Sequence, residues 1–294
     1  GRSRHISCSP AISLQVGAAT TWPRLLRVLS PAIAARDLAS TLLLPSASRD
    51  KLDRAARKCD AMIRSLDDLA ELRIRECAQQ AIAEFRRSVR PIYAAEADDY
   101  SQLEHVGSCI LLEIDGQRVL STAAHIADWL TKSWKLCVLG LVGTHPIGIV
   151  GRVRATVPPM GIRHWDHVDC AFWEVPEAVA AALGSVEFLG PSRISHNRAP
   201  VLGRAYTAFG YPVSRNADSI DATGSISVRM SVYTGGLVGA PPDLAAKLPA
   251  SGDGHLLLNF GKEGTTTDGE TVATFDPQGL SGGALIDLGD FTQH

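Results

Sequence analysis

The sequence predicts a mainly β fold that follows an α-helical extension, and two observations support this prediction. After about residue 97 the chain carries short apolar runs separated by turn residues, and many short strands at this spacing are typical of a β-sandwich or β-barrel. Before that point, residues 48–90 contain no glycine or proline, and apolar residues recur there in steps of three and four, as on one face of a helix. The 294 residues suffice for more than one folding unit.

This change of pattern divides the chain into three parts. Residues 1–97 are the N-terminal extension, which is expected to be helical over about 48–91, because Pro91 cannot continue a helix. Residues 98–200 and 201–294 are expected to form two β units.

The helical segment carries an apolar stripe that keeps its register for about three heptads and then shifts by one residue. The stripe consists of Leu52, Ala55, Cys59, Met62, Leu66 and Leu69. One interpretation is a coiled-coil or partner-binding helix, which would place the domain in a larger assembly or mask a substrate cleft. The other, which we favour, is that one or two helices pack on the neighbouring domain, and Ser65-x-x-Asp68 indicates a second helix start.

Composition and charge argue against several classes of function. A net charge of −2 gives no electrostatic basis for binding nucleic acid or an anionic membrane. No apolar run approaches the roughly 20 residues that span a bilayer, and the N-terminal residues do not form a convincing signal peptide. Six scattered cysteines fit free thiols in a reducing compartment better than a disulfide framework, so we expect a cytoplasmic protein.

One stretch near the C-terminus has the residue types of a catalytic turn. It reads Gly279-Leu280-Ser281-Gly282-Gly283 and leads into an apolar run. Glycine has no Cβ and tolerates positive φ, so the turn can direct the N–H groups of Gly279 and Ser281 into one concavity. Such a concavity suits an oxyanion that develops beside a serine hydroxyl. An ordinary tight turn before a strand is the alternative.

Two further segments offer a base and a carboxylate. His125 follows small residues at the end of an apolar strand, and histidine is the usual residue for moving a proton near neutral pH. Asp169 stands where a polar loop enters the apolar run Cys170–Val175, so its carboxylate can be partly buried and can orient an imidazole. Asp166 lies further into the loop, so we expect Asp169→Asn to be severe and Asp166→Asn to be mild. The alternatives are that His125 is a structural histidine and that Asp169 is a turn residue at the start of a strand.

Together, the three segments resemble the trypsin/chymotrypsin-like serine peptidases, which are double β-barrel enzymes. The order His125, Asp169, Ser281 matches that family, as do Thr-Ala-Ala-His ending at His125 and Gly-x-Ser-Gly-Gly around Ser281. The resemblance covers roughly residues 107–294.

The resemblance implies a serine endopeptidase that cleaves peptide or protein substrates through an acyl-enzyme, without a cofactor or a metal. Ser281 would be the nucleophile and His125 the general base and then acid, while Asp169 would orient the imidazole and stabilise its cation. The N–H groups of Gly279 and Ser281 would bind the oxyanion. Phe275, six residues before the nucleophile, would lie at the base of the specificity pocket and favour an apolar or small substrate side chain.

The sequence departs from secreted members of that family in three ways. Leu280 replaces the aspartate that locks the oxyanion turn after zymogen cleavage, and Ile126 replaces a half-cystine, so the chain resembles bacterial or intracellular members more closely. Only 13 residues follow Ser281 (294 − 281 = 13). We therefore expect a first barrel over residues 98–200 and an incomplete second barrel over 201–294.

The sequence leaves two other functions open. A catalytically inactive peptidase fold could serve as a binding or regulatory module, which the short C-terminal end favours. A metal site could use the cluster from His164 to Cys170, in which His164-x-x-His167 has a workable spacing, although zinc normally needs a second pair of ligands.

Overall fold

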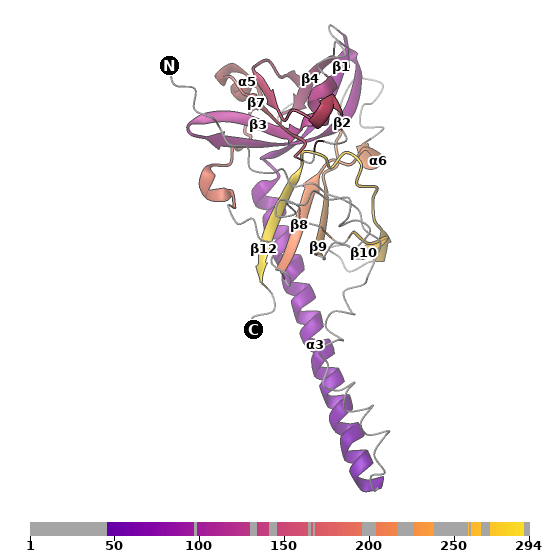
Figure 1. Cartoon of the computed structure of the whole chain (residues 1–294). Coiled ribbons are helices and arrows are strands. Elements are labelled where there is room, and N and C mark those ends of the chain that lie inside the picture. Colours follow the sequence, from indigo (N-terminus) through magenta and orange to yellow (C-terminus); the bar gives the residue numbers. More distant parts are fainter. Residues whose placement is uncertain are drawn as a thin grey trace.

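The described part of the chain is mainly β, with one long helix. The structure is a computed structural model, and it describes residues 46–96, 99–129, 134–140, 146–163, 166, 168–195, 204–216, 226–237, 258, 260–265 and 271–290. A seven-stranded antiparallel sheet lies at one end, a three-stranded sheet lies next to it, and the helix runs beside the second sheet (Figure 1).

Helix α3 (Ser46–Phe85) is one uninterrupted helix of 40 residues. The second helix start predicted at Ser65-x-x-Asp68 is wrong, because α3 continues through both residues. The segment contains no glycine or proline that would break it. Glu71 accepts a hydrogen bond from Arg75 at 2.6 Å, and an acid four residues before a base is the favourable orientation on a helix.

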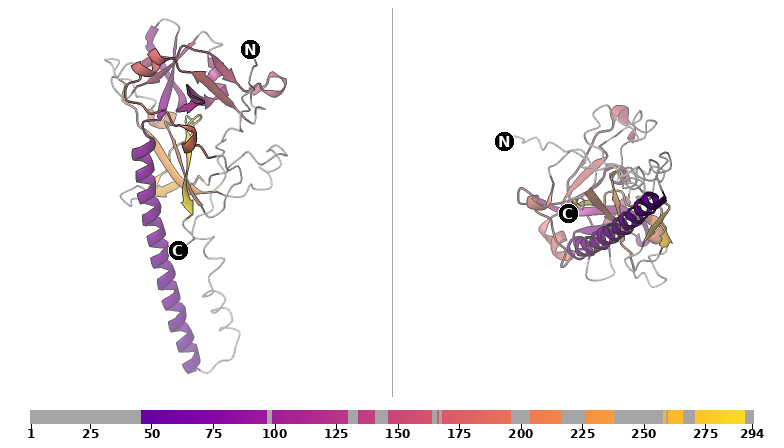
Figure 2. Two further views of the ribbon diagram at one scale, coloured as in Figure 1. Left: turned by 90° about the vertical axis from the view of Figure 1, so that its left-hand side faces the viewer. Right: turned by 90° about the horizontal axis from the view of Figure 1, so that it is seen from below.

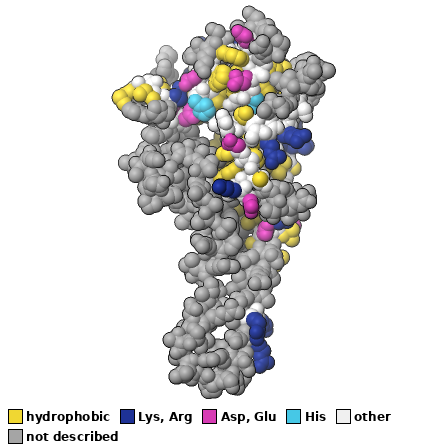
Figure 3. Space-filling model, turned by 90° about the vertical axis from the view of Figure 1, so that its right-hand side faces the viewer, with side chains coloured by type: hydrophobic (Ala, Val, Ile, Leu, Met, Phe, Trp, Pro, Cys, Tyr) yellow, Lys and Arg dark blue, Asp and Glu magenta, His cyan; other side chains and the backbone are white. Residues whose placement is uncertain are grey.

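The C-terminal end of α3 packs against the three-stranded sheet. Ala81 is buried in one cluster with Phe209 and Ala284, which belong to two strands of that sheet. Further towards the N-terminus, Leu69 and Leu72 are 61% and 53% exposed, and the helix projects away from both sheets (Figures 1 and 2). Basic side chains lie on the surface of the projecting end (Figure 3).

The end of the helical segment differs from the sequence prediction. The expected boundary near residue 91 is wrong, because α3 ends at Phe85 and strand β1 (Val89–Glu96) follows. The first sheet thus begins inside the segment that was expected to be the extension. All of β1 except its last residue is buried, and a short buried strand cannot be told from a helix by periodicity. Pro91 is tolerated because the neighbouring strand β4 (Trp134–Leu139) pairs with β1 only from Ile92 onwards.

The seven-stranded sheet has the order β5-β4-β1-β2-β3-β7-β6. Its further strands are β2 (Asp99–Ile114), β3 (Gln117–Ala123), β4 (Trp134–Leu139), β5 (Pro146–Gly148), β6 (Val153–Ala155) and β7 (Cys170–Glu174). The edge strands β5 and β6 are consecutive in the chain. In the segment between them, the Ile149 N–H donates to the carbonyl of Leu136 in β4 at 2.8 Å. The Arg152 carbonyl accepts from the N–H of Glu174 in β7 at 3.0 Å. The sheet is therefore curled, with its two edges joined by one short segment.

The hairpin between β2 and β3 turns at Asp115-Gly116, a dipeptide that is typical of such tight turns. Both residues have positive φ, 51° for Asp115 and 75° for Gly116, as a type I′ turn requires. The hairpin sets the register that pairs Ile114 with Gln117 and Ile110 with Ser121.

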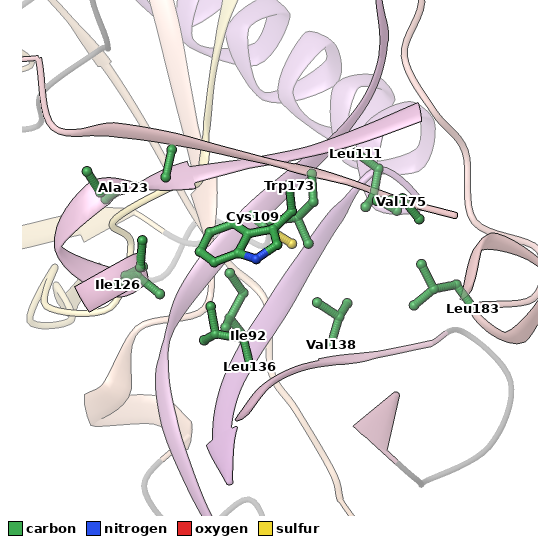
Figure 4. Close-up of a cluster of buried hydrophobic side chains, with 14 of the residues drawn as sticks. Ile92, Cys109, Leu111, Ala123, Ile126, Leu136, Val138, Trp173, Val175 and Leu183 are labelled. Atoms are coloured by element: carbon green, nitrogen blue, oxygen red, sulfur yellow. The ribbon is translucent and has the colours of Figure 1, made fainter. Parts of the chain in front are cut away.

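The main core lies inside the curled sheet. Trp173 of β7 is 1% exposed and packs among buried residues from the other strands (Figure 4). Ile92, Cys109 and Leu136 bring β1, β2 and β4 to this core, and Ile126 brings the short helix α4 (Ala124–Ala127). Because Ile126 is fully buried, the turn that follows β3 is anchored in the core.

The three-stranded sheet has β8 at its centre and β12 and β9 at its sides. Its strands are β8 (Arg204–Gly210), β9 (Ser231–Gly236) and β12 (Ala284–Asp290). The remaining elements are β10 (Glu263–Thr265) paired with β11 (Thr271–Ala273), α5 (Glu177–Ala182), α6 (Val213–Asn216) and the 3₁₀ turns Pro159–Gly161 and Pro191–Arg193. The described elements from Arg204 onwards are thus mainly strands, in agreement with the mainly β prediction. None of the described helices has the length and apolar character to cross a bilayer.

Candidate active site

His125 lies in α4, directly after β3. Ala124 is fully buried, and its N–H donates to the Asp169 carbonyl at 3.0 Å. This close contact between two chain segments explains the small residues before the histidine. Ile126 points into the core (Figure 4), whereas the His125 side chain is exposed.

Asp169 holds both the ring and the backbone of His125. His125 Nδ1 and Asp169 Oδ2 are 2.6 Å apart, and the His125 N–H donates to Asp169 Oδ1 at 2.8 Å. An ionised carboxylate only accepts, so the proton belongs on Nδ1 and the lone pair of Nε2 is left to accept. The two side chains are 42% and 30% exposed, which keeps the pair accessible from solvent.

Asp166 lies beside this pair but plays a different structural part. Its Oδ1 accepts from the N–H groups of Val168 and Asp169, at 3.1 and 3.0 Å. Its Oδ2 accepts from Arg163 Nη1 at 2.5 Å and from the Thr156 hydroxyl. Asp169, rather than Asp166, is bonded to the imidazole.

The serine segment consists of two consecutive turns directly before β12. Leu280 N–H donates to the Pro277 carbonyl at 2.9 Å, and Gly283 N–H donates to the Leu280 carbonyl at 2.7 Å. The third residue of each turn, Gly279 and Gly282, has positive φ, 92° and 79°. This is the pattern of a type II turn, which explains why glycine occupies both positions.

These turns leave two N–H groups available. The Gln278 carbonyl accepts from Val213 N–H at 2.8 Å, so the Gly279 N–H of the same peptide points the opposite way. The Leu280 carbonyl accepts from the Gly283 N–H in the second turn, so the Ser281 N–H of the same peptide points the opposite way. Neither N–H donates to another residue within the part of the chain that the structure describes. Both remain available to bind an oxygen atom of a ligand.

Ser108 joins the serine segment to the first sheet. It is fully buried in β2, and its N–H donates to the Ser281 carbonyl at 2.9 Å. Its hydroxyl donates to the Gly279 carbonyl at 2.9 Å and accepts from Tyr211 N–H at 2.8 Å. The Ser108 carbonyl in turn accepts from the Thr122 hydroxyl at 2.7 Å. Ser108 therefore holds both turns against β2, and Thr122 links this contact to β3, the strand that leads to the histidine.

Two glycines allow this close approach. A Cβ at Gly282 would lie 2.2 Å from both the Ser108 carbonyl oxygen and Thr122 Oγ1. A Cβ at Gly107 would lie 3.1 Å from the carbonyl oxygen of the serine and 2.4 Å from Ile126 Cδ1. Gly107 therefore lies beside both the serine carbonyl and the residue that follows the histidine.

The structure brings the three sequence-predicted residues together to different degrees. His125 and Asp169 are joined by two hydrogen bonds, whereas Ser281 is placed near them through its backbone. Among the interactions of described residues there is no hydrogen bond between the Ser281 side chain and His125. Catalytic hydrogen bonds are often long in unliganded structures and shorten when substrate binds.

The residues on either side of the serine segment are apolar. Leu280 is buried, and its Cδ2 lies 2.8 Å from the position of a Cβ at Gly210. Phe275 is partly buried, and its ring packs edge-on against Phe260 with 5.4 Å between centroids. Phe260 packs on Tyr233 with 4.1 Å between centroids. Three aromatic rings thus lie in a row at the segment that precedes the serine.

Sequence reasoning missed three residues around the site, namely Ser108, Thr156 and Arg163. Ser108 carried a weak signal, since it follows a glycine at the start of an apolar run. Thr156 and Arg163 carried no local signal, because Thr156 bonds to Cys170 and Arg163 to Asp128, which stand in other segments of the chain.

The metal-site alternative cannot be placed in this structure. His164 and His167 lie outside the described residues. Among the residues that are described, no three His, Cys, Asp or Glu side chains gather as a set of metal ligands.

Comparison with known proteins found no protein-family model that matches this chain and no curated protein that matches it. The geometry of the residues themselves is therefore the basis for inferring a function.

Proposed function

We propose that this chain is a serine endopeptidase of the trypsin-like type. In this proposal the curled seven-stranded sheet corresponds to the first barrel and the three-stranded sheet to part of the second. The observation that carries the proposal is the double hydrogen bond between His125 and Asp169, beside a glycine-rich turn that holds Ser281.

In this proposal, Ser281, His125 and Asp169 carry out the reaction. Ser281 Oγ attacks the carbonyl carbon of the peptide, and His125 Nε2 takes the hydroxyl proton. Asp169 stabilises the imidazolium that forms and keeps the ring in one orientation. The C–N bond then breaks, His125 gives the proton to the leaving amine, and an acyl-enzyme remains. Water attacks the ester in the same way and releases the acid and the free Ser281 hydroxyl.

The oxyanion of each tetrahedral intermediate would accept hydrogen bonds from the N–H groups of Gly279 and Ser281. Support comes from the finding that neither N–H has a partner among the described residues. Removing one such donor typically costs about 3 kcal/mol of transition-state stabilisation.

The residues near the serine suggest the class of substrate side chain. Phe275, with Phe260 and Tyr233 behind it, offers an apolar surface rather than a charge. We therefore propose that the enzyme prefers an apolar or small side chain before the cleaved bond.

Labelling by a fluorophosphonate probe tests the proposal directly. The unmodified chain should react, while Ser281→Ala should not react, and Ser281→Ala and His125→Ala should each lower kcat by a factor on the order of 10³–10⁶. Ser214→Ala is the matched control, since Ser214 is an exposed serine that bonds only weakly to the Asp276 carbonyl at 3.3 Å. Labelling that persists in Ser281→Ala would contradict the proposal.

An inactive binding module is the second candidate. The observation that favours it is that no hydrogen bond joins Ser281 to His125 among the described interactions. In that case the unmodified chain would fail to react with the probe, although it would be folded and would bind an extended peptide.

A further inference from the structure

We infer that Arg163 and Asp166, together with Asp128, form a clamp that holds the Asp169 loop and the His125 turn in one geometry. The clamp residues act as positioning residues, since they bond to the segments that carry the reactive side chains rather than to the imidazole. The effect of the clamp on reaction rate rests on the proposed function, whereas its effect on geometry does not.

The first arm of the clamp is Asp166, whose side chain is only 4% exposed. One of its oxygens accepts from the N–H groups of Val168 and Asp169, and the other accepts from Thr156 and Arg163. Asp169 has a φ of 40°, a backbone conformation that residues other than glycine rarely adopt. The hydrogen bond to the Asp169 N–H is therefore one of the contacts that maintain this unfavourable conformation.

The second arm is Arg163, which reaches the turn that carries the histidine. Its Nε and Nη2 donate to the two carboxylate oxygens of Asp128, each at 3.0 Å. Its Nη1 donates to Asp166 at 2.5 Å and to the Thr156 carbonyl at 2.9 Å. Asp128 ends α4, and its N–H donates to the Ala124 carbonyl. The planar guanidinium thus connects the two segments through three fixed donors.

The charges of the clamp depend on one another. Burial by itself would raise the pKa of the Asp166 carboxyl, but hydrogen bonds from Thr156, the Asp169 N–H, Arg163 and the Val168 N–H together hold that pKa below its ordinary value. Without Arg163, the buried Asp166 carboxylate would lose its cationic partner, and the Asp169 loop would relax.

Arg163→Ala and Arg163→Lys in the full chain test the inference. A shift of about 1 Å between Asp169 and His125 is expected to lower kcat by about 10–10²-fold with little change in KM. Lysine keeps the charge but lacks the planar fork that bonds to both oxygens of Asp128 while a third donor bonds to Asp166, so its effect should be intermediate. Arg204→Ala is the matched control, because it removes another part-buried Arg–Asp pair, on the second sheet, and should leave kcat unchanged.

Hydrogen exchange gives a readout that does not depend on activity. The His125 N–H donates to Asp169 Oδ1, so its exchange should accelerate in Arg163→Ala and stay slow in Arg204→Ala. Asp166→Asn should also accelerate exchange at the His125 N–H. All partners of the Asp166 carboxylate are donors, and the NH₂ group of asparagine would face one pair of them: either Thr156 and Arg163, or the two loop N–H groups. This replaces the mild effect that the sequence suggested for Asp166→Asn.

The outcomes separate the clamp from the proposed function. Unchanged exchange at His125 and unchanged kcat in Arg163→Ala would overturn the clamp while leaving a Ser281-dependent peptidase intact. Faster exchange at His125 in a chain that never reacts with the probe would support the clamp and contradict the peptidase. If Arg163→Ala does not fold, Arg163→Lys provides the test instead. Exchange at His125 and kcat equal to those of the unmodified chain would then overturn the clamp.

Discussion

The loop that carries Asp169 and the segment that carries Ser281 are held in place by different interactions. The Asp169 loop depends on charged side chains, above all Arg163 and Asp166. The serine segment depends on backbone hydrogen bonds, on the uncharged hydroxyl of Ser108 and on close backbone packing. A loop held by charges responds to pH and to charge reversal, whereas a segment held by close packing responds to added volume.

Among the changes that weaken either of these two regions, loss of the carboxylate that faces the imidazole should have the largest effect on rate. Asp169→Asn keeps the shape of the side chain but presents an amide that favours the wrong tautomer of His125. We expect kcat to fall by about 10⁴-fold with the fold intact. Steady-state kinetics and the melting temperature check this result, with Asp287→Asn as the control on the second sheet. Activity in Asp169→Asn close to that of the unmodified chain would refute our assignment of the third residue.

Added volume in the serine segment should have the largest effect on stability. Gly282→Ala would force a Cβ to within 2.2 Å of the Ser108 carbonyl oxygen, at a φ of 79°. We expect a loss of about 3 kcal/mol or more in the free energy of unfolding, measured by urea denaturation.

Gly116→Ala is the matched control for that variant. Gly116 has a similar φ of 75°, but a Cβ there meets nothing within 4 Å. Only the backbone cost of about 1 kcal/mol should remain. Equal losses in Gly282→Ala and Gly116→Ala would show that close packing does not hold the serine segment.

Acid should weaken the fold in two separate pH ranges. Burial lowers the pKa of His105 from 6.5 to about 4, so the unfolded chain binds a proton between these values while the folded chain does not. Stability should fall by about 3 kcal/mol as the pH drops through this window. The pKa of the Asp166 carboxyl is held below its ordinary value of 3.8. A second loss of stability is therefore expected below that pH, where protonation of the carboxylate removes the hydrogen bonds of the loop.

A variant without the histidine separates the two ranges. The ring of His105 packs edge-on against Tyr93 with 5.3 Å between centroids, so His105→Phe can retain the contact. Urea midpoints of this variant should be flat between pH 6.5 and 4. Below that range, exchange at the His125 N–H should accelerate before exchange at the Ser108 N–H, which holds the serine segment. Simultaneous acceleration would mean that the two loops are coupled.

A smaller effect is expected for Ser108→Ala, because it removes one hydroxyl. The Gly279 carbonyl would lose its donor and the Tyr211 N–H its acceptor, and both groups are buried. We expect a loss of about 2 kcal/mol in stability. Ser88→Ala is the matched control, since Ser88 is also fully buried but its hydroxyl has no partner among the described residues. Equal melting temperatures for the two variants would refute a role for Ser108 in holding the turns.

Local chemistry made parts of the fold and site predictable from the sequence. The Asp115-Gly116 hairpin depends on two adjacent residues that tolerate positive φ, so its signal is contained in the sequence. The residues His125 and Asp169 were selected because small or apolar residues flank them at strand ends, and the structure places them within hydrogen-bond distance.

Long-range contacts explain what the sequence did not reveal. Strand β1 was missed because it follows a helix without glycine or proline between them, and its burial comes from β2 and β4. The roles of Arg163 and Ser108 depend on partners 35 and 171 residues away, Asp128 and Gly279. Neither of these distant partners can be identified from the local sequence.

The length of α3 has a consequence for how the protein diffuses. A helix of 40 residues is about 60 Å long. A compact chain of 294 residues would have a radius of gyration of about 19 Å. Because α3 projects beyond both sheets, scattering should give a larger radius, and the molecule should tumble more slowly about its short axes than about the helix axis.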